Sequence, residues 1–220
     1  ASASAQAVLF DFNNAPLHTP LPINLTEGGI TAHFSATGPG YSIQDTSAPV
    51  VPIGFTGRFS EQKALHLLIS AFAEIAPEFP RARLLLVGSG PLQQQLEAQT
   101  RHLGVRDKIV FTGLRSDIAT VLAAMDLFVM TSLWEGLSRS LAEAMYAKLP
   151  VIASDVGGTS DAVRNGETGW LIPPNDVPAT RDALLAALRD PEGARRYGEA
   201  GYQWARAAFD PRGMQNRLES

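Results

Sequence analysis

Two basic residues near position 60 are spaced to hold an anion between them. Arg58 follows an apolar run directly after Gly57, and Lys63 comes five residues later, near the expected start of a helix. The helix macrodipole disfavours a cation there by about 0.3–1 kcal/mol. A bound diphosphate would offset that cost, because Arg offers a bidentate fork and Lys a point charge. The alternative is a pair of solvated surface cations, which is how most Arg and Lys residues occur.

Two acidic residues, Glu135 and Glu143, flank the start of another expected helix. Ser138 is a suitable N-cap, and the free amides at a helix start form an anion site together with the helix dipole. Because residues 141–147 are largely apolar, a carboxylate at Glu143 must be paired or ligand-bound, or it costs several kcal/mol. Two ribose hydroxyls would satisfy it, while Glu135 at the mouth would contact a sugar. The alternative for Glu143 is a solvated helix position.

Two glycine-containing segments, GSGP at 88–91 and SDVGGT at 154–159, also follow apolar runs. The glycines of the first segment permit close approach of a ligand to the backbone, and Pro91 suits the first position of a helix. A tight strand-to-helix turn is the simpler interpretation of this pair. For the second segment a structural role is the default.

These residues must be positioned by alternating strands and helices, which the apolar periodicity of residues 49–220 predicts. The expected strands are Val50–Thr56, Leu84–Val87, Lys108–Phe111, Leu127–Met130, Val151–Ala153 and Gly169–Ile172. The expected helices are Glu61–Ile75, Leu92–Leu103, Asp117–Met125, Ser138–Ala147, Ser160–Arg164, Ala179–Arg189 and Glu192–Ala208. Short apolar strands between amphipathic helices indicate a doubly wound, parallel, Rossmann-like α/β sheet. Its ligand crevice lies at the carboxyl ends of the strands, where all four segments above are expected.

Residues 1–48 differ from the rest of the chain. The first 49 residues contain three acidic residues and no Lys or Arg, whereas all 18 basic residues come later. Alternation over Gly29–Thr37 predicts a strand, and Val8–Phe12 and Tyr41–Gln44 are further candidates. Two or three strands alone bury too little to be stable. We expect a β-rich or partly disordered segment of unknown role, which either belongs to an incomplete β-sandwich or packs on the domain of residues 49–220.

The composition excludes several classes of protein. The formal net charge of −4 argues against a nucleic-acid binder, and no apolar run approaches the roughly 18 residues of a transmembrane helix. The chain has no Cys, which excludes thiolate metal sites, and the spacing of His18 and His33 matches no metal site. The lack of Cys suits a cytoplasmic protein, which could also work at the inner face of a membrane. The start ASASAQA resembles a signal-peptidase site, but a flexible tail is the expectation.

Six motifs, in order over residues 51–220, resemble the C-terminal, donor-binding domain of the family 4 retaining glycosyltransferases, which have the GT-B fold. The motifs are GRFSEQKA, LLLVGSGP, IVFTGLRSDI, MDLFVMTSLWEGLSRSLAEAM, LPVIASDVGGTSDAV and NGETGWLIPPND. Each motif alone is moderately specific, but six in order are highly specific. The spacing of Glu135 and Glu143 is the hallmark of this family. Residues 1–48 resemble no part of it.

The resemblance implies catalytic roles for Arg58, Lys63 and Glu135. The two cations would grip the donor diphosphate and stabilise the leaving nucleotide, Glu135 would contact the donor sugar, and Glu143 would bind the ribose. Gly57 and Gly136 are further implied donor-binding positions. Leu114 and Arg115 would contact the base, and the backbone of Leu137, Ser138 and Arg139 would meet the diphosphate. Such enzymes transfer a sugar from a nucleotide sugar with retention and without a catalytic metal, because cations and helix amides stabilise the leaving group.

Three features depart from the family pattern. Ala64 stands where Gly is usual, and Arg139 stands where a small or neutral residue is commoner. The N-terminal acceptor-binding domain of the family has no counterpart in residues 1–48, so we expect a truncated or fused chain.

These observations leave three hypotheses. The leading one is a glycosyltransferase donor domain that binds a nucleoside diphosphate or nucleotide sugar, and that transfers sugar poorly or not at all alone. The second is a non-enzymatic binding or interaction module on a degenerate glycosyltransferase scaffold. The presence of Arg58, Lys63, Glu135 and Glu143 argues against degeneracy, since the fold alone does not need them. In the third, a partner chain supplies the missing half. The base, the sugar and the acceptor stay open.

Overall fold

The computed structural model describes the backbone of residues 23–27, 30–34, 44–45, 48–136 and 138–208, with side chains over residues 50–136 and 138–207. Every structural statement below concerns these parts of the chain.

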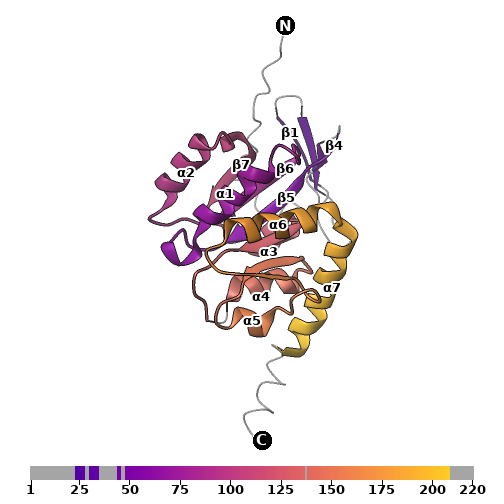
Figure 1. Ribbon diagram of the computed structural model, residues 1–220. Coiled ribbons are helices and arrows are strands. Elements are labelled where there is room, and N and C mark those ends of the chain that lie inside the picture. Colours follow the sequence, from indigo (N-terminus) through magenta and orange to yellow (C-terminus); the bar gives the residue numbers. More distant parts are fainter. Residues whose placement is uncertain (1–22, 28–29, 35–43, 46–47, 137, 209–220) are drawn as a thin grey trace, which may run out of the picture.

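The larger part of the chain forms a six-stranded sheet with helices on both faces (Figure 1). The strand order is β10-β9-β8-β5-β6-β7, and all neighbouring pairs are parallel. The strands are β5 (Val51–Thr56), β6 (Ala82–Val87), β7 (Ile109–Gly113), β8 (Leu127–Met130), β9 (Val151–Ser154) and β10 (Trp170–Ile172). The chain therefore winds outward in both directions from the central pair of β5 and β8. This order confirms the predicted doubly wound Rossmann-like fold.

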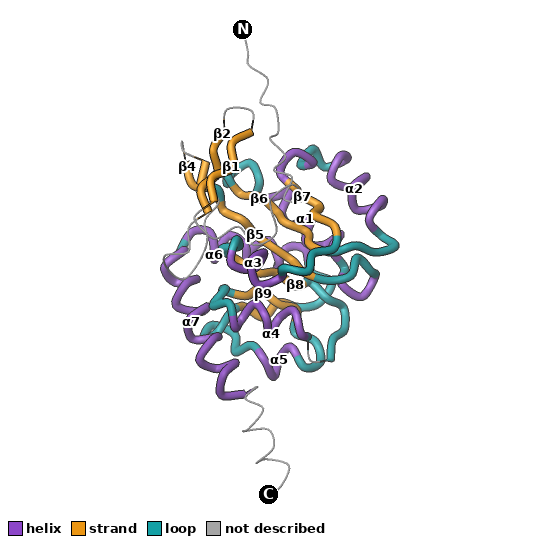
Figure 2. The backbone as a smooth tube through the Cα atoms, turned by 180° about the vertical axis from the view of Figure 1, so that it is seen from behind, coloured by secondary structure: helices purple, strands orange, loops and turns teal. Residues whose placement is uncertain are grey.

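The helices form two layers, which Figures 1 and 2 show from opposite sides. Helix α1 contacts α2 and α6 on one side, and α4 contacts α3 and α7 on the other. The helices are α1 (Leu65–Ile75), α2 (Gln93–His102), α3 (Ile118–Ala123), α4 (Arg139–Tyr146), α5 (Thr159–Ala162), α6 (Val177–Arg189) and α7 (Pro191–Ala208), with short 3₁₀ turns η2 (Glu61–Lys63) and η3 (Arg106–Lys108). None of these described helices is long and apolar enough to cross a membrane.

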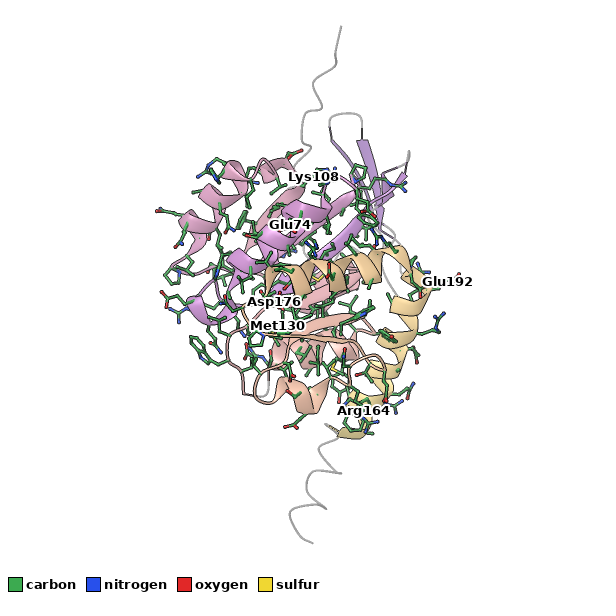
Figure 3. The ribbon with its side chains drawn as sticks, viewed as in Figure 1. Glu74, Lys108, Met130, Arg164, Asp176 and Glu192 are labelled. Carbon is green, nitrogen blue, oxygen red and sulfur yellow. The ribbon has the colours of Figure 1, made fainter. Side chains whose placement is uncertain are left out.

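The strands are largely apolar because both faces of the sheet are covered. Strands β8 and β9 are buried at every position. Met130, at the end of β8, lies inside the fold, whereas Glu74 and Glu192 lie on its surface (Figure 3). The loops after β8 and β9 therefore leave strands that are fully buried.

A second, antiparallel sheet lies before β5 in the sequence and has the order β1-β2-β3-β4. Its strands are β1 (Ile23–Glu27), β2 (Ile30–Phe34), β3 (Gln44–Asp45) and β4 (Ala48–Pro49). The predicted strand within Gly29–Thr37 is confirmed as β2. Strand β1 was missed, although its alternation of Ile and Leu with polar residues is the signal that would have found it. The candidate Val8–Phe12 lies outside the described residues, and of Tyr41–Gln44 only Gln44 lies within them.

The predicted continuous helix over Glu61–Ile75 is wrong at one position. Ala64 has a left-handed backbone with φ 45°, which separates η2 from α1. This conformation costs roughly 1–2 kcal/mol for a residue with a side chain. Lys63 therefore ends the 3₁₀ turn and stands just before α1. In the same way, Pro91 precedes α2, which begins at Gln93, rather than starting it.

Candidate functional site

The loops after β5 and β8 leave the same edge of the sheet side by side, because the two strands are paired neighbours, with Ile53 opposite Leu127. From there the chain turns to one side after β5 and to the other side after β8. Open α/β sheets bind ligands at such a divergence, outside the carboxyl ends of the strands.

A cleft of about 850 Å³ lies at this edge. It collects nine of the positions that the sequence predicted: Gly57, Arg58, Lys63, Leu114, Arg115, Glu135, Ser138, Arg139 and Glu143. Gly136 is exposed and lies outside the lining of the cleft. Leu137 lies outside the described residues. The cleft is also lined by Thr56, Val87, Ile118 and Ser140, which sequence reasoning missed because small and apolar side chains carry no chemical signal of their own.

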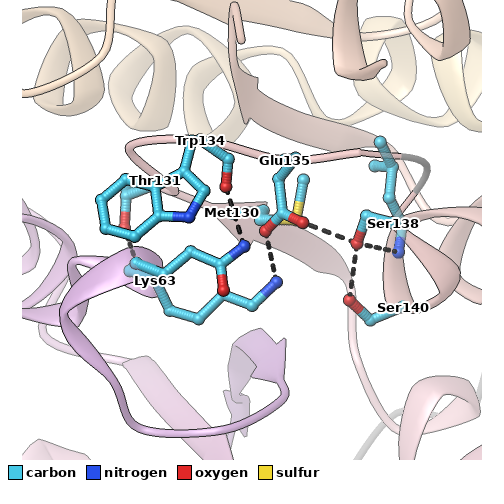
Figure 4. A network of polar contacts seen from close by, with 9 residues as sticks. Lys63, Met130, Thr131, Trp134, Glu135, Ser138 and Ser140 are labelled. Carbon is cyan, nitrogen blue, oxygen red and sulfur yellow. Dashed lines mark hydrogen bonds and ion pairs between the residues drawn. The ribbon is translucent and has the colours of Figure 1, made fainter. Parts of the chain in front are cut away.

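Lys63 and Glu135 form a salt bridge across the cleft floor (Figure 4). Lys63 comes from the loop after β5, and Glu135 comes from the loop after β8. Their side chains are only 14% and 7% exposed, so each charge depends on the other for compensation. The sequence predicted that Lys63 would face a bound anion with Arg58; in the structure its protein partner is Glu135.

Arg58 lines the cleft and is exposed. Within the described part of the chain, no hydrogen bond or ion pair joins its guanidinium to another residue. The three other cations of the cleft all have acidic partners: Lys63 with Glu135, Arg139 with Glu143 at 3.6 Å, and Arg115 with Asp117. Arg58 therefore keeps its positive charge uncompensated by a neighbouring carboxylate.

Helix α4 begins at the same edge, between the two acidic residues. The Ser138 hydroxyl oxygen accepts from the backbone N–H of Leu141 at 3.5 Å, which confirms the predicted N-cap. This hydroxyl also lies 3.1 Å from that of Ser140 (Figure 4). The cap fixes the helix start, so its remaining free amides and the positive end of the dipole face the cleft.

Glu143 corrects one expectation. Its apolar neighbours in the sequence predicted that the carboxylate must be paired or ligand-bound because of its surroundings, but those neighbours do not surround it, and its side chain is 41% exposed at the cleft. Leu141, Ala144 and Met145 are buried instead, because the helix is amphipathic and turns those three toward the sheet. Glu143 pairs with Arg139, one helical turn earlier, at 3.6 Å. The pair is loose and exposed, so the carboxylate can accept from a ligand.

Leu114 and Arg115, in the loop after β7, also line the cleft. The Arg115 guanidinium donates to both carboxylate oxygens of Asp117, at 2.8 and 2.7 Å. These hydrogen bonds lower the pKa of Asp117 below its ordinary value of 3.8. The anchored loop holds Leu114, which is 81% exposed, at the cleft.

The two glycine-containing loops pack the walls together. A Cβ atom at Gly88 would overlap the carbonyl oxygen of Gly57, and one at Gly90 would overlap that of Phe59. A Cβ atom at Gly157 would overlap the carbonyl oxygen of Glu135. The structural interpretation of both loops is therefore confirmed, and the first loop additionally lines the cleft.

Among the described residues, no group of three or more His, Asp or Glu side chains is placed to hold a metal ion.

Comparison with known proteins defines the family. Residues 51–204 match the model of glycosyl transferases group 1. The chain belongs to this family. Among curated relatives, 2-deoxystreptamine glucosyltransferase of Streptomyces kanamyceticus is 33% identical over 77% of this chain and 44% of its own length. D-inositol 3-phosphate glycosyltransferase of Nocardia farcinica is 34% identical over 73% of this chain and 39% of its own length. The chain thus spans less than half the length of each of these two relatives.

Solved structures agree with this membership. HepE of Anabaena, crystallised in complex with UDP and glucose, superposes with a TM-score of 0.70 at 28% identity, over 78% of this chain and 48% of that chain. Sucrose-phosphate synthase from Thermosynechococcus elongatus superposes with a TM-score of 0.70 at 31% identity, over 77% of this chain and 44% of that chain.

Proposed function

We propose that this domain binds the nucleoside diphosphate part of a nucleotide sugar in the cleft, for retaining transfer without a catalytic metal, as in the family 4 enzymes that its motifs resemble. One observation carries the proposal: Lys63 and Glu135, from the two diverging halves of the sheet, meet beside Arg58 and the capped start of α4.

The charges of the cleft support an anionic ligand. With Lys63, Arg115 and Arg139 each paired to a carboxylate, Arg58 and the helix amides supply the net positive potential. A diphosphate between them would receive charge-assisted hydrogen bonds from both. Lys63 then stabilises the negative charge that develops on the leaving nucleotide, and Glu135 contacts the sugar beside it.

The rim residues would hold the nucleoside. The exposed carboxylate of Glu143 fits a pair of ribose hydroxyls, and the loop of Leu114 and Arg115 fits the base. HepE was crystallised in complexes with UDP and with UDP-glucose, which supports a uridine nucleotide as the first ligand to try.

The described domain supplies one wall of a reaction site. We expect it to transfer sugar weakly or not at all by itself, because a single wall neither positions an acceptor nor excludes water. Binding is therefore a better test than turnover.

Isothermal titration calorimetry with UDP, GDP and ADP tests the proposal. We expect one of the three to bind at a ratio of one to one, equally well with and without EDTA. No heat of binding at 1 mM of any of them would overturn the proposal. A complete loss of binding in EDTA would overturn its metal-independent part.

A further inference from the structure

Four hydrogen bonds and one salt bridge join residues 62–64 to residues 131–135, in addition to the pairing of the strands that precede them. The Thr131 hydroxyl donates to the carbonyl oxygens of Lys63 and Ala64, at 3.2 Å each. The backbone N–H of Leu133 donates to the carbonyl oxygen of Gln62 at 2.8 Å. The Gln62 side-chain amide returns a bond to the carbonyl oxygen of Trp134 at 2.9 Å (Figure 4), and Lys63 pairs with Glu135. We call this set the 62–135 clasp.

The clasp holds the backbone on both sides of the two charged residues. The bonds to Gln62 and to the carbonyl of Lys63 hold the chain around Lys63. The bond from Gln62 to the carbonyl of Trp134 holds the residue before Glu135. Thr131 is 1% exposed, and its hydroxyl binds at the left-handed residue Ala64, where the backbone conformation is unfavourable without support. These contacts determine where the Lys63 ammonium and the Glu135 carboxylate stand.

We propose that Thr131 and Gln62 are positioning residues for donor binding, acting through Lys63 and Glu135. Neither side chain lines the cleft, so neither touches the ligand. This inference rests on the proposed function and extends it to two residues outside the site. A misplacement of about 1 Å from a substitution outside a site costs up to about 100-fold in reaction rate, so we expect a measurable loss of donor binding when these contacts are removed.

The test uses UDP-glucose and calorimetry on the full chain. Thr131→Val and Gln62→Met should each weaken binding about fivefold to tenfold. The matched controls are Thr180→Val and Gln99→Met. Thr180 is buried, and its hydroxyl donates to the carbonyl oxygen of Asp176 at 2.7 Å. The side-chain amide of Gln99 donates to the carbonyl oxygen of His66 at 2.8 Å. The controls lie outside the cleft lining and should bind like the parent chain.

Two further variants separate positioning from loss of folding. Thr131→Ser keeps the hydroxyl and should restore binding. In a Lys63→Met background, Thr131→Val should weaken binding less than it does in the parent chain, because the part of its effect that acts through Lys63 is already lost. Equal affinity of Thr131→Val and the parent chain, or an undiminished effect in the Lys63→Met background, would overturn the inference alone. Failure of the parent chain to bind any nucleotide would overturn the proposed function, and this inference with it.

Discussion

Gly157, in the loop after β9, lies directly against the backbone carbonyl oxygen of Glu135, with no room for a Cβ atom between them. A third strand of the sheet therefore supports the cleft residue that pairs with Lys63. The backbone of Gly157 is also left-handed, with φ 50°, which glycine adopts without steric cost.

Gly157→Ala should destabilise the fold by about 3 kcal/mol, through backbone strain and overlap with Glu135. It should also weaken the binding of UDP-glucose. The control is Gly166→Ala, where φ is 77° but no atom lies within 4 Å. The control carries only the strain, so it should lose about 1 kcal/mol and no affinity. Urea denaturation measures the stability of each variant, and calorimetry measures its affinity for UDP-glucose. Equal losses in the two variants would contradict the inference that Gly157 supports the backbone of Glu135.

Arg58→Ala should weaken UDP binding by about 1–3 kcal/mol, because it removes charge-assisted hydrogen bonds to the diphosphate. Affinity should also depend less on salt, since one cation fewer meets the anion. Arg81→Ala is the control: Arg81 is exposed but precedes β6, at the opposite edge of the sheet. Calorimetry at two salt concentrations distinguishes them, and equal affinities of the two variants would argue against a diphosphate at Arg58.

Glu143→Gln should weaken binding of UDP by about 1–2 kcal/mol, because an amide replaces a charged acceptor for the ribose hydroxyls. The control, Glu167→Gln, breaks a similar exposed pair, with Arg164 at 3.7 Å, away from the cleft. Its affinity should equal that of the parent chain. If 2′,3′-dideoxy-UDP lost as much affinity from Glu143→Gln as UDP does, the ribose contact would be excluded.

Lys63→Met should destabilise the empty domain by about 3 kcal/mol, because it leaves the largely buried carboxylate of Glu135 without its partner. Combining it with Glu135→Gln should recover most of that loss. Arg189→Met is the control, since Arg189 and Glu78 form an exposed pair at 2.9 Å and such pairs contribute under about 1 kcal/mol. Chemical denaturation of the parent chain and these three variants gives the comparison, and a Lys63→Met single variant as stable as the parent chain would contradict the coupling.

Much of the site could be predicted because sequence position and sheet edge are linked. A residue just after a parallel strand must lie at the carboxyl edge of the sheet, so Arg58 and Glu135 could be placed near one another before any coordinates. The doubly wound architecture was predicted from the alternation of strands and helices and from the right-handed crossover rule.

What could not be predicted depends on tertiary contacts. Ala64 is a strong helix former, so its own propensity predicts a helical residue. The Gly that is usual at this position in the family was the one sign of a left-handed turn, and the hydrogen bond that supports this residue comes from Thr131, 67 positions away. The exposure of Glu143 depends on which side of α4 faces the sheet. Gln62 and Thr131 were missed because a single amide or hydroxyl is ordinary in any loop.

A crystal structure with bound UDP-glucose would show where every part of the donor lies. We expect the diphosphate between Arg58, Lys63 and the start of α4, the ribose at Glu143 and the glucose at Glu135. A nucleotide bound elsewhere on the domain, or one whose diphosphate contacts neither cation, would contradict it.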